Sequence, residues 1–105
     1  MAEYKKLFEP GNIGTLQVKN RIIFPPMITL YVTPEGGVSE RLIDHYVERA
    51  RGGAGLIVIE SSYPRRYKGR ICLTDDKFIP GLARLAEAVH RESQSRLHPT
   101  AMHSC

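Results

Sequence analysis

The residues of this chain best suited to chemistry form a short run, Pro25-Pro26-Met27, that directly follows three apolar residues, Ile22-Ile23-Phe24. The apolar residues, two of them β-branched, predict a short buried strand. The prolines end it abruptly, because proline fixes φ and has no backbone N–H to donate. Ligands of parallel α/β folds bind at the carboxyl ends of strands, so this rigid apolar corner could contact a flat aromatic cofactor. The alternative is a plain strand end whose prolines only block further pairing, and this stretch by itself favours that alternative.

A second candidate is Glu60, which follows the unbroken apolar run Leu56-Ile57-Val58-Ile59. Such a run after a helix predicts a parallel strand buried on both faces, so Glu60 would lie at the same edge of the sheet as Met27. A carboxylate in this place could act on a ligand. It could equally accept hydrogen bonds from neighbouring backbone or from the loop beyond it, and we favour a structural role.

Basic residues cluster in that loop, with two tyrosines among them: Arg65, Arg66, Lys68 and Arg70, with Tyr63 and Tyr67. Three interpretations are open, namely a nucleic-acid contact, a solvated loop, and a loop that meets a phosphate. The formal net charge of the chain is +4. A nucleic-acid contact ranks last, because the rest of the chain has no basic stripe.

The composition is that of a globular protein rather than a disordered one, since 42% of the 105 residues are hydrophobic and 25% are charged. The length predicts one small domain. No apolar run approaches the ~20 residues of a membrane span, and the first residues lack the apolar core of a signal peptide. We therefore expect a cytoplasmic protein.

The two cysteines, Cys72 and Cys105, match neither a disulfide framework nor a zinc pattern.

The elements that must position these residues alternate between strand and helix. Residues 12–20 predict a small β-hairpin ahead of the first buried strand. Residues 40–51 predict an amphipathic helix with Ser39 as its N-cap. Together with the strands at 22–24 and 56–60, this helix makes one βαβ unit.

A loop, a second helix and a tail follow this unit. Residues 61–79 predict a long loop without periodicity, and Pro80 begins the second amphipathic helix. The apolar period stops after His90, and residues 91–105 predict a disordered tail. We predict no metal site, because the tail offers no scaffold to hold its two histidines and its cysteine around an ion.

Short motifs appear in a fixed order along this framework. The first block is Leu7-Phe8-Glu9-Pro10, Ile13-Gly14, Lys19-Asn20-Arg21-Ile22 and Pro26-Met27. The second block is Tyr46, Ala50, Gly52-Gly53, Gly55-Leu56 and Glu60, followed by Gly69-Arg70. From Leu7 to His90 the chain resembles the old yellow enzyme family, the NADH:flavin oxidoreductases that include ene-reductases and 2,4-dienoyl-CoA reductases.

The resemblance implies an α/β fold: an N-terminal hairpin plus the first two strand–helix units of a (β/α)8 (TIM) barrel, incomplete. It implies FMN as cofactor and NADH or NADPH as reductant. Hydride would pass through the flavin to an activated C=C bond or a similar acceptor in a small-molecule substrate, with no nucleic-acid or membrane partner. Carried over to this sequence, Pro25, Pro26, Met27 and Ile28 would line the flavin edge, and Ser61 would lie near its ring.

Two positions depart from the family pattern. Pro25 stands where alanine is usual, and Ile28 stands where threonine, cysteine or glycine is frequent. A side chain that tunes the flavin's potential would therefore be absent at position 28, which changes redox tuning but not flavin binding.

The larger departure is length, because a (β/α)8 barrel needs about 250 residues. We therefore expect residues 1–90 to be the N-terminal part of an FMN-binding TIM-barrel domain, with none of the family's catalytic residues. The chain alone should be inactive and should self-associate through its uncovered apolar surface. The rival hypothesis is a small non-catalytic α/β module that binds a partner through its exposed strand edge or its basic loop.

Two explanations are open for residues 91–105, which do not resemble the family. The family would continue with a Gly-rich turn and a strand that carries Gln-Leu. Codons for residues 97–101 can be chosen so that a frame one nucleotide later encodes Phe-Ile-Gln-Leu, and we expect a frame change near residues 91–93. The alternative is a native short protein with a disordered C-terminus.

Overall fold

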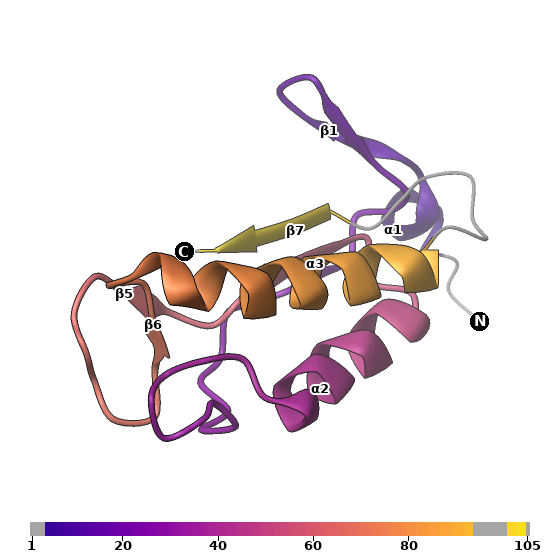
Figure 1. The fold of residues 1–105 in the computed structure, drawn as a ribbon. Helices are drawn as coiled ribbons and strands as arrows, with labels where there is room; N and C mark the ends of the chain where they lie inside the picture. Colours follow the sequence, from indigo (N-terminus) through magenta and orange to yellow (C-terminus); the bar gives the residue numbers. More distant parts are fainter. Residues whose placement is uncertain (1–3, 94–100, 105) are drawn as a thin grey trace.

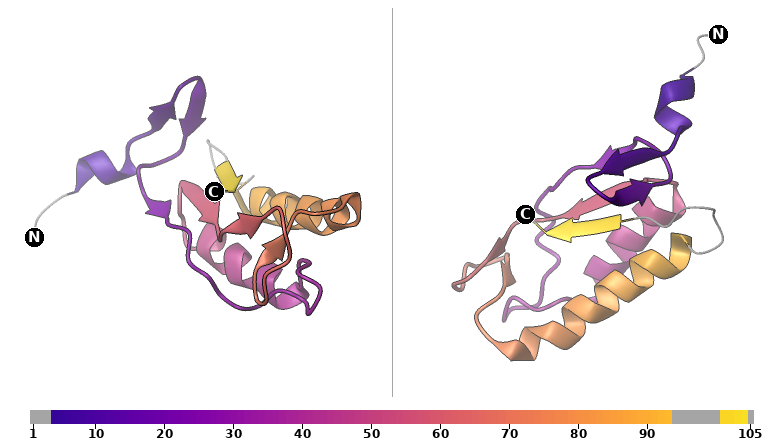
Figure 2. Two further views of the ribbon diagram at one scale, coloured as in Figure 1. Left: turned by 90° about the vertical axis from the view of Figure 1, so that its left-hand side faces the viewer. Right: turned by 90° about the horizontal axis from the view of Figure 1, so that it is seen from above.

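The computed structural model describes residues 4–93 and 101–104, and a small parallel sheet lies at its centre. The sheet has the order β3-β4-β7, formed by Ile23–Phe24, Leu56–Ile59 and Ala101–Ser104. Two helices, α2 (Glu40–Arg51) and α3 (Ile79–Ser93), pack against each other on one side of this sheet (Figures 1 and 2). The buried core between helices and sheet consists of Leu42, Ile43, Tyr46, Ala50, Ala54, Ile57, Ile59, Ile71, Leu85 and Val89.

The predicted βαβ unit is confirmed. Strands β3 and β4 are parallel neighbours, with Ile23 opposite Leu56 and Phe24 opposite Ile57, and α2 connects them. Helix α2 begins where predicted, because the Ser39 hydroxyl accepts a hydrogen bond from the Leu42 N–H at 3.0 Å. The helix therefore starts at the same end of the sheet at which β3 stops.

The predicted hairpin is also confirmed. A single helical turn, α1 (Lys5–Phe8), precedes the antiparallel strands β1 (Gly11–Ile13) and β2 (Leu16–Val18). Gly14 has φ +60°, a left-handed conformation that glycine adopts without steric cost, and it makes the tight turn between the strands. The hairpin projects from the rest of the fold (Figure 1).

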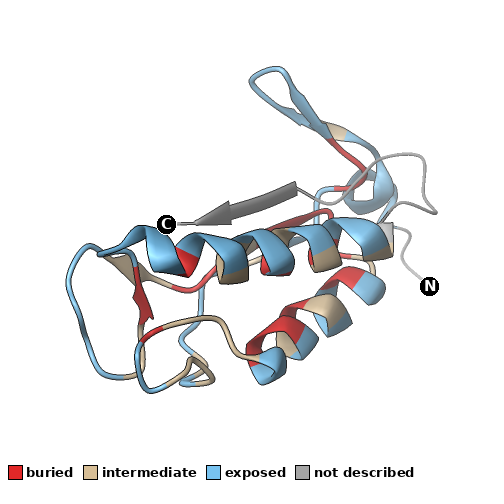
Figure 3. Cartoon of the chain, in the orientation of Figure 1, coloured by how far each residue is buried: buried red, intermediate tan, exposed pale blue. Residues whose placement is uncertain are grey.

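The expectation of a buried strand at 22–24 is wrong. Ile22 is 37% exposed and Ile23 is 55% exposed, whereas Leu56, Ile57 and Ile59 of β4 are buried as expected. The reason is that β3 is an edge strand, and within the described residues only one side of the sheet is covered by helices (Figure 3). Hydrophobicity alone could not reveal that one face of β3 lacks a covering layer.

The structure also differs from the expectation of a disordered tail over residues 91–105. Helix α3 continues to Ser93, and β7 pairs in parallel with β4, from Ala101 opposite Leu56 to Ser104 opposite Ile59. This pairing satisfies backbone groups along an edge of β4 that would otherwise be open. Residues 94–100 and 105 lie outside the described part of the chain.

Residues 61–79 contain more regular structure than predicted. Strands β5 (Ser62–Tyr63) and β6 (Ile71–Cys72) are parallel, and a 3-10 turn, η1 (Asp76–Phe78), leads into α3. Helix α3 begins one residue before Pro80. Among the described residues, no helix combines the length and the apolar character that crossing a membrane requires.

Candidate functional site

The apolar corner that follows β3 is exposed at the carboxyl edge of the sheet. Pro25, Pro26, Met27 and Ile28 all lie at the surface, and Met27 is 51% exposed. Ser61 is half-buried and follows β4 after one intervening residue. Because β3 and β4 are parallel neighbours, the structure brings all five of these residues to the same edge.

A buried hydrogen-bond network centred on Glu60 lies behind this edge. The Glu60 side chain is fully buried, and its Oε1 accepts hydrogen bonds from the Thr29 hydroxyl at 2.8 Å and from the Tyr46 hydroxyl at 3.2 Å. The Glu60 N–H donates to the Tyr46 hydroxyl at 2.9 Å. One carboxylate therefore connects the end of β4 with α2 and with the segment that follows β3.

This network anchors the backbone that directly follows the corner. Thr29 Oγ1 also accepts a hydrogen bond from the Tyr31 N–H at 3.1 Å. Between them, Leu30 has φ +65°, a left-handed conformation that costs an L-residue with a side chain roughly 1–2 kcal/mol. The surrounding contacts must offset that cost, so the backbone just after Ile28 is held by its neighbours rather than by its own preference.

Glu60 makes the buried hydrogen bonds expected of a structural residue, but its partners were not predicted. Helical periodicity placed Tyr46 on the apolar stripe of α2 and gave no information about its hydroxyl. Thr29 carries the only aliphatic hydroxyl between Ile22 and Val32. That isolated hydroxyl within an apolar run was the available sign of a buried polar partner.

His45 lies off the apolar stripe of α2, a position that predicts a surface histidine, but the structure encloses it more than that. Its ring is half-buried and contacts three aromatic rings, with centroid distances of 5.1 Å to Tyr46, 5.7 Å to Tyr31 and 6.0 Å to Phe24. Burial lowers the pKa of His45, the Arg49 guanidinium lowers it further, and Glu60 partly opposes them. The ring thus packs α2 against the segment that follows β3.

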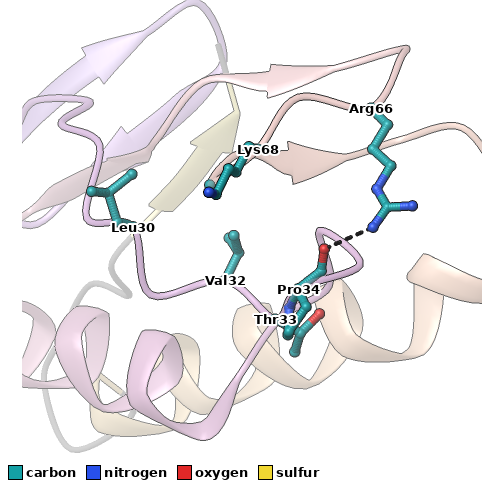
Figure 4. A pocket seen from close by; sticks show the side chains of 7 residues that line it. Leu30, Val32, Thr33, Pro34, Arg66 and Lys68 are labelled. Atoms are coloured by element: carbon teal, nitrogen blue, oxygen red, sulfur yellow. Dashed lines mark hydrogen bonds between the residues drawn. The ribbon is translucent and has the colours of Figure 1, made fainter.

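The basic loop forms one wall of a cavity of about 890 Å3. Leu30, Val32 and Pro34 contribute one side, and Arg66 and Lys68 contribute the other (Figure 4). Arg66 Nη2 donates a hydrogen bond to the Pro34 carbonyl at 3.1 Å, which links the two loops. Two of the four clustered cations therefore line a cavity at the carboxyl end of the sheet.

The residues at this edge fit a flat aromatic group. The corner offers apolar side chains and open backbone, and the Ser61 hydroxyl lies at the end of the adjacent strand. The rigid Glu60 network holds the corner from behind. Such an arrangement suits binding and orientation of a ring more than acid–base chemistry.

Comparison with known proteins places the chain in a family. Residues 6–96 match the NADH:flavin oxidoreductase / NADH oxidase family. The match extends past His90, the limit expected from the motifs. The chain is 47% identical over 95 residues to an NADH oxidase of Thermoanaerobacter brockii, a match that covers 86% of this chain and 15% of the relative.

Solved structures of related enzymes share the fold of this chain. A 2-naphthoyl-CoA reductase complex superposes with a TM-score of 0.80 at 33% identity, covering 86% of this chain and 14% of that one. The old yellow enzyme from Pichia sp. AKU4542 shares the fold, with a TM-score of 0.76 at 24% identity over 83% of this chain and 24% of that one. The predicted α/β architecture is confirmed: the chain has the hairpin and the first two strand–helix units of a TIM barrel, and it does not form a closed barrel. The chain spans about a seventh of the length of the first two relatives.

Proposed function

This chain belongs to the NADH:flavin oxidoreductase / NADH oxidase family, and from that premise we propose that residues 1–90 are the N-terminal part of an FMN-dependent NAD(P)H oxidoreductase of the ene-reductase type. Its substrates are small molecules with an activated C=C bond or a similar acceptor. The proposal includes the cytoplasmic location expected from the sequence.

The observation that carries this proposal is the exposed apolar corner braced by a fully buried carboxylate. Pro25, Pro26, Met27 and Ile28 line the edge of the flavin, largely through backbone and apolar contacts, and Ser61 lies near its ring. FMN, when bound, supplies a carrier that takes hydride from the nicotinamide and gives it to the acceptor. The residues of this chain bind and orient that ring. Because Ile28 has no polar side chain, it offers the ring an apolar contact without a hydrogen bond.

A hybrid enzyme tests the proposal. Residues 7–90 replace the matching segment of the NADH oxidase of Thermoanaerobacter brockii, to which the chain is 47% identical. We expect the purified hybrid to release FMN on denaturation and to oxidise NADH, because the grafted corner provides the flavin-binding edge. The measurements are chromatography of the released flavin and absorbance at the NADH band.

Two further preparations make the result decisive. The hybrid with Met27→Asp should lose FMN while keeping its elution volume, since bound flavin would bury an unpaired carboxylate against its apolar edge at a high desolvation cost. The 105-residue chain alone should show no saturable quenching of FMN fluorescence at micromolar concentrations, because it provides too few strands to enclose the ring. A hybrid that folds but contains no FMN would refute the proposal.

We further propose that the isolated chain self-associates through the hairpin and the uncovered face of β3. Exposed apolar side chains gather there: Ile13, Leu16, Ile22 and Ile23 are 50%, 41%, 37% and 55% exposed. Sedimentation velocity should give a mass above the 11.8 kDa of one chain. Changing Ile23 to lysine should shift the distribution toward the monomer, and Leu73→Lys, at an exposed position outside this face, should not. A strictly monomeric wild-type chain contradicts the proposal.

A further inference from the structure

We propose that the cavity between residues 30–34 and 66–69 binds the anionic group, a phosphate or a carboxylate, of an organic electron acceptor. The assignment rests on the proposed flavin chemistry and specifies the substrate class for it. It also selects among the three interpretations of the basic loop, in favour of a loop that meets an anion.

The charge of the lining supports an anion. Arg66 and Lys68 are the charged residues of the lining, and no acidic side chain takes part in it. Lys68 makes no hydrogen bond or ion pair with the described residues, and its side chain extends toward Leu30 and Val32 (Figure 4). Arg66 uses Nη2 to hold the Pro34 carbonyl, which leaves further guanidinium donors for a ligand.

The opposite wall supports an apolar body attached to the anion. Leu30 is 65% exposed although its backbone is held in the left-handed region. Gly69 leaves room for the Leu30 side chain, because a Cβ at that position would lie 2.7 Å from Leu30 Cδ2. A strained residue that presents a large apolar side chain to a cavity is a pattern typical of binding sites.

Hydrogen bonds tie the loops around the cavity to neighbouring backbone, and the cavity is close to the flavin corner. The Gly37 N–H donates to Thr33 Oγ1 at 2.8 Å, and the Cys72 N–H donates to the Gly36 carbonyl at 2.8 Å, so both loops are held. Leu30 lies three residues after Met27. An acceptor anchored here by its anion would therefore place its apolar body toward the edge assigned to the flavin.

Equilibrium dialysis of the 105-residue chain with phenyl phosphate at about 0.15 M ionic strength, where exposed charges outside the lining are screened, tests the inference without flavin. We expect saturable binding with a Kd below about 1 mM, similar binding of benzoate, and weaker binding of inorganic phosphate and of benzyl alcohol. Lys68→Gln should weaken phenyl phosphate binding about tenfold. Arg65→Gln, which removes the same charge from the same loop outside the lining, should change it less than twofold.

A second variant separates binding from folding. Leu30→Gly removes the apolar wall and relieves the left-handed strain, so phenyl phosphate binding should weaken while the urea midpoint stays the same or rises. Equal loss in Lys68→Gln and Arg65→Gln would overturn the site, because only general charge attraction would remain. Binding of ADP-ribose tighter than phenyl phosphate, with the same dependence on Lys68, would overturn the assignment to the acceptor. A hybrid without FMN refutes the proposed function and leaves this binding result unaffected.

Discussion

Replacing Gly55 with alanine is expected to lower the free energy of unfolding by about 3 kcal/mol, at the upper end of the range for overpacking. A Cβ at position 55 would lie 2.4 Å from Asn20 Oδ1 and 2.6 Å from the Asn20 carbonyl oxygen. Asn20 cannot move away easily, because its Nδ2 donates to the Gly53 carbonyl at 2.7 Å and its Oδ1 accepts from the Ile22 N–H at 3.0 Å. The methyl group would therefore push β3 away from β4.

Urea denaturation followed by circular dichroism measures this loss, with all variants at one protein concentration so that association is held constant. Gly11→Ala is the matched control, because a Cβ there meets its nearest neighbour, Arg21 Cγ, at an ordinary 3.5 Å. In the hybrid enzyme, Gly55→Ala should also lower FMN content, since β3 leads into the corner. Equal urea midpoints for wild type and Gly55→Ala would show that the two strands can separate without cost.

Replacing Glu60 with alanine is expected to reduce FMN affinity of the hybrid about tenfold and stability by about 2 kcal/mol. The substitution leaves the Thr29 and Tyr46 hydroxyls without their shared acceptor and releases the segment that follows β3. Thr29→Val should reproduce the loss of FMN affinity with a smaller loss of stability, about 1 kcal/mol, because it removes the Thr29 bonds to Glu60 and to the Tyr31 N–H but keeps the bonds between Glu60 and Tyr46.

Fluorescence titration of the FMN-free hybrid gives the affinity, and urea denaturation gives the stability. Glu35→Ala removes an exposed carboxylate from the loop between β3 and α2 and should change neither quantity. If Thr29→Val leaves FMN affinity unchanged while Glu60→Ala weakens it, the corner is not held through Thr29, and Glu60 acts through α2 alone.

The sequence was informative wherever one local pattern determined one local structure. Ser39 and the apolar stripe that follows it predicted the limits of α2. The run from Leu56 predicted a buried parallel strand, and Gly14 predicted a tight hairpin turn. Glu87 and Arg91 form the ion pair, 3.1 Å long, that their i, i+4 spacing predicts. These outcomes depend on residues within one or two turns of each other.

The sequence could not predict that Ile23 is exposed or that residues 101–104 pair with β4. Burial of a strand depends on which layers cover its two faces, and those layers come from elsewhere in the chain. The apolar composition of β3 is the same whether or not a layer covers it. Likewise, β7 pairs with β4 because the open edge of β4 offers backbone hydrogen-bond partners. The polarity pattern of the tail gives no information about that edge.

The candidate site also has features that the sequence predicts and features that only the tertiary structure shows. The sequence identified Pro25-Pro26-Met27 and Glu60 as residues at the carboxyl edge, since parallel strands end on one side of a sheet. The partners of Glu60 and the cavity shared by Leu30 and Lys68 join residues that lie about 14 to 38 positions apart. Only the tertiary structure brings them together, because hydrogen bonds and cavities depend on distance in space, whereas sequence patterns report distance along the chain.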